Sequence, residues 1–129
     1  MAGPVTDDPY SGDMSVAPSD CLFCRIVRGE IPAEIVHETE STLSFRDVNP
    51  QAPTHVLVVP KAHHANVVEQ AATDPGGVTE LVSVAGTIAR QAGLDGYRLV
   101  FNTGVEGGQT VFHTHLHLLG GRAMTWPPG

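Results

Sequence analysis

The sequence predicts a single α+β domain built on an antiparallel sheet. Its 129 residues suit one folded domain. Five short segments have the composition of strands, and one longer segment has helical periodicity. Most connections between the strand segments are too short for the crossover that parallel neighbours require, and this favours antiparallel pairing.

The first residues carry no signal for a folded element. Residues 1–19 are rich in Asp, Pro, Ser and Gly and show no periodic apolar pattern, which predicts a flexible extension. Residues 20–129 are expected to form the folded domain. It should open with a short helix over residues 21–28, which Asp20 caps and Gly29 ends.

Three strand segments follow the short helix. Residues 34–38 and 42–48 contain β-branched and aromatic side chains on either side of a polar turn, so they predict a hairpin. The next segment, "THVLVVP" at residues 54–60, is almost continuously apolar. This composition predicts a central strand that is covered on both faces. A short helical segment is expected within residues 61–70.

The second half of the chain contains the longest expected helix and two more strands. Residues 73–77, "TDPGG", predict a turn. In residues 78–92 the apolar side chains recur at helical spacing, and Gly93 is the expected end of that helix. Residues 97–102 and 111–119 complete the five predicted strands.

Composition argues against several classes of function. The chain has 7 Lys and Arg against 14 Asp and Glu, a net charge of −7, and no basic stripe to neutralise a nucleic acid backbone. Residues 1–19 lack the basic and apolar parts of a signal peptide. The chain also lacks an apolar stretch of about 18 residues, the length that crosses a membrane. We therefore expect a soluble, cytoplasmic protein without a nucleic acid or membrane partner.

The stretch "VFHTHLHLL" at residues 111–119 places three histidines two positions apart. On a strand, side chains alternate between faces, so His113, His115 and His117 share one face while the residues between them pack on the other. A solvated cluster, a catalytic metal site and a histidine nucleophile all fit this row. The glycine-rich loop at residues 102–110 favours a nucleophile that acts on phosphorus, because its backbone N–H groups suit an anion. Imidazole is both nucleophilic and easily protonated, as that chemistry requires.

Cys21 and Cys24 form a single CxxC pair near the start of the folded domain. In a reducing cytosol such a pair indicates metal binding or redox chemistry before a structural disulfide. A zinc site, a redox pair and two inert buried thiols all remain open from these residues alone.

Several motifs together resemble one known family. "HTHLHLL" at residues 113–119 resembles the histidine-triad motif, in which three histidines alternate with hydrophobic residues. The segments "EIP", "FRDVNPQAPTHVLVVPKAH", "GYRLVFNTG", "GGQTVFHTHLHLLGGR" and "WPPG" are similar, in order and spacing, to the Hint branch of purine nucleoside phosphoramidases. The resemblance covers nearly all of residues 20–129. Thr110 stands where this branch commonly has serine, and it keeps the hydroxyl group.

The resemblance implies a fold and an activity. The fold is the histidine-triad fold, a five-stranded antiparallel sheet with two helices, in a homodimer whose sheets join into ten strands. The activity is hydrolysis of purine nucleoside phosphoramidates through a nucleotidyl-histidine intermediate, with no cofactor for catalysis. Two alternatives remain: a nucleotide-binding dimer that acts mainly through protein interaction, with slow residual hydrolysis, and a metalloenzyme centred on the histidine row.

The resemblance also implies roles for individual residues. His115 is the expected nucleophile, and His117 is expected to contact the phosphate. His113 and His55 would support orientation and proton flow, and Thr110 would lie at the catalytic centre. The positions that match the family's nucleotide-binding residues are Leu22, Phe23, Ile26, Phe45, Asp47, Val48, Asn102, Gly108, Gln109, Thr110, His115, His117 and Trp126. Asp47 would bind the ribose hydroxyls, and Trp126 would reach toward the other subunit.

A structural zinc site is the last implication of the resemblance. Histidine-triad proteins with such a cysteine pair often use it, together with two histidines, to bind zinc. The matching ligands here are Cys21, Cys24, His55 and His113. Such a closed tetrahedral set stabilises a fold without catalysing a reaction. If zinc binds there, the proton-relay role of His55 and His113 weakens. The remaining histidines, His37, His63 and His64, are expected to be surface or local structural residues.

Overall fold

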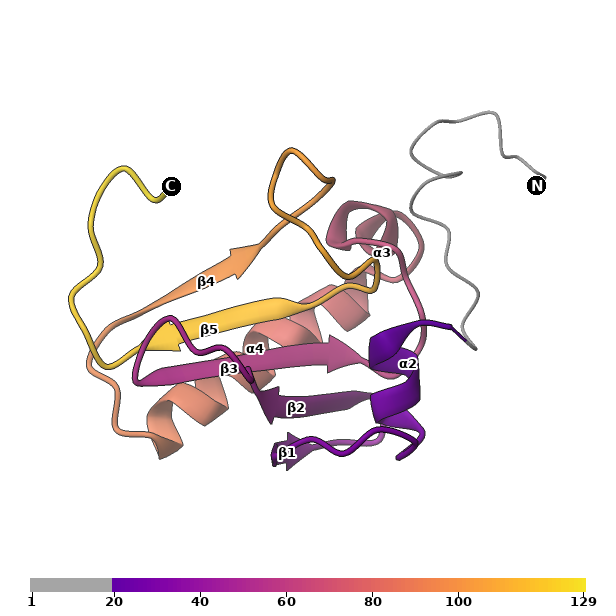
Figure 1. The fold of residues 1–129 in the computed structure, drawn as a ribbon, viewed down its shortest axis with the longest axis horizontal. Coiled ribbons are helices and arrows are strands. Elements are labelled where there is room, and N and C mark those ends of the chain that lie inside the picture. The colour runs from indigo at the N-terminus through magenta and orange to yellow at the C-terminus, as the bar shows by residue number, and fades with distance from the viewer. Residues whose placement is uncertain (1–19) are drawn as a thin grey trace.

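Five strands form one antiparallel sheet in the order β1-β2-β3-β5-β4 (Figure 1). In the computed structural model residues 20–129 are described, and the extension predicted for residues 1–19 lies outside this range. The strands are Ile35–Glu38 (β1), Thr42–Arg46 (β2), Thr54–Pro60 (β3), Tyr97–Phe101 (β4) and Leu116–Gly120 (β5). The helices are Leu22–Val27 (α2), Val67–Thr73 (α3) and Pro75–Gln91 (α4). The predicted α+β class and antiparallel sheet are confirmed, with three helices in the described part where the family resemblance implied two.

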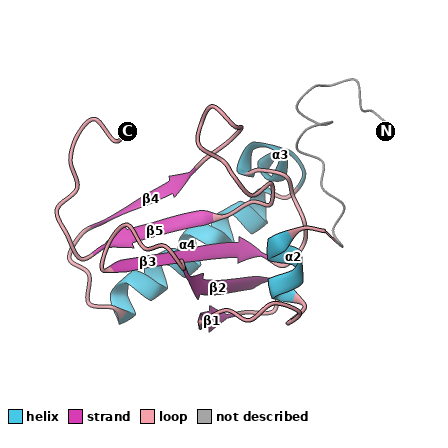
Figure 2. Ribbon diagram, viewed as in Figure 1, coloured by secondary structure: helices cyan, strands magenta, loops and turns pink. Residues whose placement is uncertain are grey.

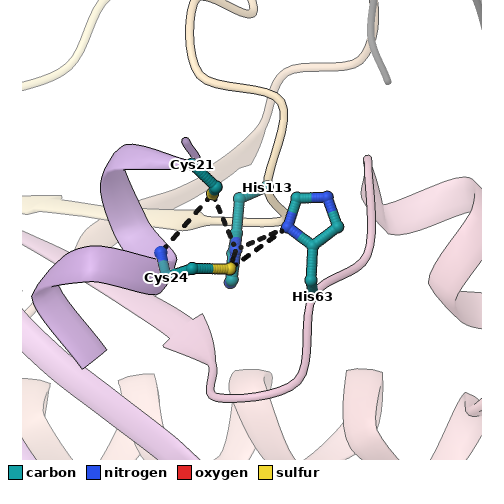
Figure 3. Close-up of side chains that lie close together, drawn as sticks. All are labelled: Cys21, Cys24, His63 and His113. Carbon is teal, nitrogen blue, oxygen red and sulfur yellow. Dashed lines mark hydrogen bonds between the residues drawn. The ribbon is translucent and has the colours of Figure 1, made fainter. Parts of the chain in front are cut away.

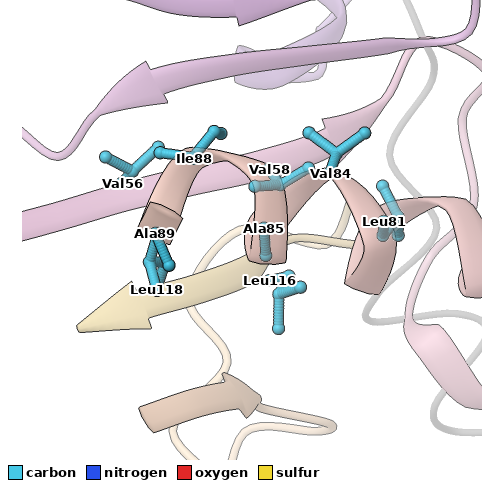
Figure 4. Close-up of a cluster of buried hydrophobic side chains, with 9 residues drawn as sticks. All are labelled: Val56, Val58, Leu81, Val84, Ala85, Ile88, Ala89, Leu116 and Leu118. Atoms are coloured by element: carbon cyan, nitrogen blue, oxygen red, sulfur yellow. The ribbon is translucent and has the colours of Figure 1, made fainter. Parts of the chain in front are cut away.

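The sheet is covered on both faces (Figure 2). Helix α4 packs against one face, where a cluster of buried aliphatic side chains joins it to the central strands (Figure 4). On the opposite face, α2 packs over a second buried cluster that contains Phe23, Phe45 and Leu57. Alternate residues of β3 therefore serve both clusters, with Val56 and Val58 in the first cluster and Leu57 in the second. The predicted central strand is confirmed.

The amino ends of the helices differ from the expected ones. Helix α2 is capped by Cys21, whose Sγ accepts from the N–H of Cys24 at 3.4 Å, and not by Asp20. Helix α4 begins at Pro75, inside the segment predicted as a turn, because Asp74 caps it by accepting from the N–H of Gly77 at 3.1 Å. Proline suits the first helical position because its missing N–H would have no partner there.

Strand β5 begins at Leu116, later than predicted. It pairs with β3 in a register that sets Leu116 opposite Val58, so a continued ladder would place Val59 opposite His115 and Pro60 opposite Thr114. Proline has no N–H to continue a ladder. The N–H of Thr114 instead donates to the carbonyl of His64 at 2.8 Å. His113 and His115 therefore precede the strand, and His117 is the one histidine of the row that lies within it.

Among residues 20–129, none of the helices is long and apolar enough to cross a membrane.

The packing between α4 and the sheet predicts the cost of a cavity there. Leu118 is fully buried between α4 and the sheet. Leu118→Ala should lower the free energy of unfolding by about 2–5 kcal/mol, because the lost contacts leave a void in a close-packed core. Val82→Ala, at a position on α4 that is 43% exposed, should change it by less than about 0.5 kcal/mol. Urea denaturation measures both, and equal effects would contradict this account of the core.

Candidate functional site

A cavity of about 390 Å³ opens between α2, the end of β2 and the histidine row. The predicted nucleotide-binding residues on its wall are Leu22, Phe23, Ile26, Phe45, Asp47, Val48, Thr110, His115 and His117. One side of the cavity is apolar and includes Phe23 and Phe45, whose rings meet edge to face at 5.5 Å between centroids. The other side carries Asp47 and the histidines. Such a cavity suits a flat apolar group joined to an anionic one.

Some residues of the cavity wall were not among those predicted from the sequence. These residues are Ile31, Pro32, Ala33, Arg46, Leu57 and Val111. A signal existed for Leu57, because it lies two positions after His55 on β3 and so shares the same face of the strand. The segment containing Ile31 directly follows the short helix in the motif "EIP", which also marks this place.

His115 is held so that one ring nitrogen is free. Its Nδ1 donates to the backbone carbonyl of His113 at 2.8 Å, which leaves a lone pair on Nε2. The side chain is buried, and burial lowers the pKa of His115 more than the nearby Asp47 carboxylate raises it. The imidazole is therefore neutral near pH 7, in the form that attacks an electrophile.

A chain of hydrogen bonds determines which ring nitrogens of His55 and His117 carry a proton. The N–H of Gln51 donates to His55 Nδ1 at 3.0 Å, so the proton of neutral His55 lies on Nε2. That Nε2 is 2.9 Å from His117 Nδ1 and donates to it. The remaining nitrogen of His117, Nε2, then carries a proton, is buried and has no hydrogen-bond partner among the described residues. It is a donor available to an anion in the cavity.

Burial keeps this pair of histidines neutral. Burial and the neighbouring His115 and His55 lower the pKa of His117 to about 4. Burial also lowers the pKa of His55, although the Asp47 carboxylate, with Oδ2 3.5 Å from His55 Nε2, raises it. The three side chains Asp47, His55 and His117 are close enough to hold a metal. The bond between the two imidazoles already engages the ring nitrogens that would bind it, so we interpret the group as a hydrogen-bonded relay.

Gln109 lies beside the cavity but not on its wall. It is 3% exposed, and its Oε1 accepts from the N–H of Gly104 at 2.9 Å. Its Nε2 donates to the carbonyls of Ala65 at 2.7 Å and Val111 at 3.1 Å. These bonds occupy the amide, so Gln109 holds the glycine-rich loop, and its place among the nucleotide-binding residues stays a prediction.

Three other predicted nucleotide-binding residues are not on the cavity wall either. Asn102 lies next to Gly108, which has φ of +93° and so uses the freedom of glycine to turn the loop. Trp126 is 83% exposed near the end of the chain. Within this single chain, these three residues do not join the histidines around the cavity.

Four further side chains converge behind α2: Cys21, Cys24, His63 and His113 (Figure 3). Their ligand atoms all lie within 4.8 Å of one another. His113 Nδ1 is 3.4 Å from Cys21 Sγ, 3.5 Å from Cys24 Sγ and 3.2 Å from His63 Nδ1. Ligands of a tetrahedral zinc ion are about 3.3–3.8 Å apart, so this cluster has the size of such a site.

The chemistry of these four groups also fits zinc. His113 Nε2 donates to the carbonyl of Pro60 at 2.8 Å, so its Nδ1 lone pair faces the cluster. Burial lowers the pKa of His113 to about 4, and it lowers that of His63, so both imidazoles are neutral as ligands must be. Burial and Cys21 raise the pKa of Cys24 to about 11. A cation in the cluster would favour the thiolate that metal binding requires.

His55 does not belong to this cluster, and the expectation that it completes the ligand set is wrong. The antiparallel register places His55 opposite Leu119, at the far end of the ladder from His113. His63 follows the other end of β3, beside the segment that precedes β5, and takes the fourth position. His63 is therefore not the local structural residue that was expected.

A small α+β domain with a row of histidines beside an apolar cavity defines the histidine-triad class of proteins. Residues 28–124 match the sequence model of the HIT domain, and the chain belongs to the HIT family.

Relatives with names and solved structures support this membership. A 14 kDa zinc-binding protein of Zea mays is 47% identical over 120 residues, which cover 86% of this chain and 89% of that one. A purine nucleoside phosphoramidase of Escherichia coli K12 is 43% identical over 107 residues, covering 81% and 90%. The crystal structure of a HIT family hydrolase from Legionella pneumophila superposes with a TM-score of 0.82 at 52% identity, covering 84% and 99%.

The corrected ligand set predicts which histidine is required for zinc binding. His63→Gln should lower bound zinc well below one ion per chain, because it removes one of four ligands. His55→Gln, the matched control, should bind zinc as the unaltered protein does, because His55 lies with His117 instead. Elemental analysis of the purified proteins after dialysis measures this. Zinc loss in the His55 variant alone would contradict the assignment.

Proposed function

We propose that this protein hydrolyses purine nucleoside phosphoramidates through a covalent nucleotidyl intermediate on His115. One observation carries the proposal: the ring of His115, with a free lone pair on Nε2, lies 4.9 Å between centroids from the ring of His117, on the wall of a largely apolar cavity. The Nε2–H of His117 has no hydrogen-bond partner among residues 20–129. A nucleophile and an anion donor next to a recess for a flat group are the parts this reaction needs. The relationship to a purine nucleoside phosphoramidase adds support.

The reaction proceeds in two displacements. Nε2 of His115 attacks the phosphorus, the bond from phosphorus to the substrate nitrogen breaks, and the departing amine takes up a proton. Water then attacks the same phosphorus, breaks its bond to Nε2 and releases the nucleoside monophosphate and one proton. His117 donates to a phosphate oxygen, where negative charge builds up in both steps. Thr110, on the cavity wall, offers a hydroxyl to the phosphate or the leaving group.

The apolar side of the cavity is proposed to hold the base. Phe23, Phe45 and Ile26 enclose it, and a purine ring stacks or packs against such groups more readily than a smaller, more polar base. Asp47 is on the same wall and is proposed to bind the ribose hydroxyls, because a carboxylate accepts two hydrogen bonds. Val48 is 99% exposed and lies at the rim.

Zinc at Cys21, Cys24, His63 and His113 is proposed as a structural ion, with no cofactor for the reaction itself. The donor set, the spacing and the relationship to a zinc-binding protein support it. A homodimer is proposed as well. Strand β4 is an edge of the sheet, and Trp126 is exposed, so a second copy would cover both.

A second candidate function uses the same cavity. A nucleotide-binding dimer that acts through protein interaction would bind AMP but turn over slowly. The exposed Trp126 and the edge strand β4 are the surfaces that favour it. A kcat well below about 1 s⁻¹ on an adenosine 5′-phosphoramidate, with ordinary AMP binding, would favour this function over hydrolysis.

The nucleophile assignment is tested by His115→Ala. Hydrolysis and the nucleotidyl adduct should both disappear, because the attacking nitrogen is gone, while AMP still binds in the cavity. Intact-mass measurement after a brief reaction with adenosine 5′-phosphoramidate detects the adduct, and calorimetry measures AMP binding.

His37→Ala is the matched control, because His37 lies on β1 and is not on the cavity wall. It should keep both the activity and the adduct. An adduct that persists in the His115 variant, or that maps to another residue, would remove His115 from the proposed role.

A further inference from the structure

We infer that metal binding at Cys21, Cys24, His63 and His113 is positively coupled to nucleotide binding in the cavity, and that Phe23 transmits this coupling. The inference rests on the proposed function, because it takes the cavity as a nucleotide site. It goes further by making the metal ion a determinant of nucleotide affinity and not solely of stability.

Helix α2 belongs to both sites. The metal-cluster residue Cys21 caps its amino end, and the helix contains Cys24. Between and beside these cysteines, Leu22, Phe23 and Ile26 form part of the cavity wall. A helix of 6 residues is too short to be stable by itself, so its position depends on its contacts. A metal held by both cysteines would fix the helix, and the wall with it.

The ring of Phe23 touches each part of the proposed pathway. It is 5% exposed and meets the ring of His113 edge to face at 6.0 Å and that of His115 at 5.0 Å between centroids. It also meets Phe45, on the apolar wall, at 5.5 Å. A metal ligand, the proposed nucleophile and the base recess thus share one buried side chain. In a close-packed interior, a shift of one of these rings moves the others.

His113 provides a second connection through its backbone. Its Nδ1 faces the metal cluster, its Nε2 donates to Pro60, and its carbonyl accepts from His115 Nδ1 at 2.8 Å. A metal bond to Nδ1 would restrain this residue at a third point. The acceptor that holds His115 would then be restrained as well.

The coupling has a definite sign. Without a metal, the four donor groups are joined by hydrogen-bond contacts of 3.2 to 3.5 Å. Such contacts order α2 less than metal bonds do, so a nucleotide that binds metal-free protein must also order the helix. A prior metal ion removes that cost, which makes the coupling positive. By linkage, the nucleotide raises metal affinity by the same factor.

The experiment closes a thermodynamic cycle on the full chain. Calorimetry measures the Kd of AMP for zinc-loaded and metal-free protein, with circular dichroism to verify that both are folded. AMP should bind the zinc-loaded form about tenfold more tightly, within the usual range of coupling between sites. Competition with a chelator, with and without AMP, should give the same factor for zinc.

Two variants separate Phe23 from the rest of the wall. Phe23→Leu keeps the four metal ligands and an apolar wall but removes the aromatic ring. It should bind zinc normally, while the ratio of the two AMP affinities falls toward one. Ile26→Val is the matched control on the same helix and the same wall, and it should keep the ratio of the unaltered protein.

Cobalt(II) in place of zinc gives a readout that does not require metal-free protein. Its visible d–d bands report the geometry of the ligands. AMP should change these bands in the unaltered protein, and much less in Phe23→Leu. Equal AMP affinities in both forms together with an unchanged cobalt spectrum would overturn the coupling and leave the proposed function standing. If AMP binds neither form, the nucleotide site itself is wrong, and the coupling with it.

Discussion

The antiparallel register between β3 and β5 is the constraint on which the rest of the molecule depends. It pairs Val56 with Leu118 and Val58 with Leu116, and these four side chains meet α4. The residues between them point to the other face, where His117 on β5 faces the cavity. A shift of one residue would exchange the two faces of a strand, burying imidazoles under α4 and exposing leucines. The core therefore fixes which face of β5 turns His117 toward the cavity.

The end of that ladder matters as much as its register. Strand β3 has no backbone N–H donor at Pro60. The residues before β5 instead bond to the segment that follows β3, where the N–H of Thr114 donates to the carbonyl of His64. The carbonyl of Pro60 accepts from His113, which turns the other nitrogen of that ring toward the cysteines. His63, in the same segment, reaches the same place. A proline that ends a ladder thus helps to build the cluster of donors beside it.

Much of the fold could be predicted from the sequence because it depends on local pattern. The strand segments, the long helix and the two-sided burial of β3 follow from alternation and from apolar composition, and apart from the starts of β5 and α4 they lie where they were expected. The cap of α4 was missed because Asp74 and Pro75 serve a turn and a helix start equally well. The early end of the pairing was missed because it depends on which residue of β3 faces Thr114, and that requires the register.

The residue types of the site could be predicted from the sequence better than the contacts that those residues form. A face shared by alternate histidines follows from local geometry. The exchange of His55 for His63 does not, because it depends on which end of β3 lies beside His113. Gln109 was placed among the nucleotide-binding residues by resemblance, and in this structure its buried amide forms hydrogen bonds with backbone groups of Gly104 and Ala65. The error in the ligand set thus comes from contacts between residues that are distant in sequence.

The three histidines of the row differ because each uses a different ring nitrogen. Burial lowers the pKa of all three and makes them neutral, so each has one nitrogen with a proton and one without. His113 gives the proton on Nε2 to Pro60, and His115 gives the proton on Nδ1 to His113. His117 receives at Nδ1 from His55 and keeps its proton on Nε2. One alternating motif thus contains the proposed metal ligand, the proposed nucleophile and the proposed anion donor, and the hydrogen-bond partners of each ring determine which histidine has which role.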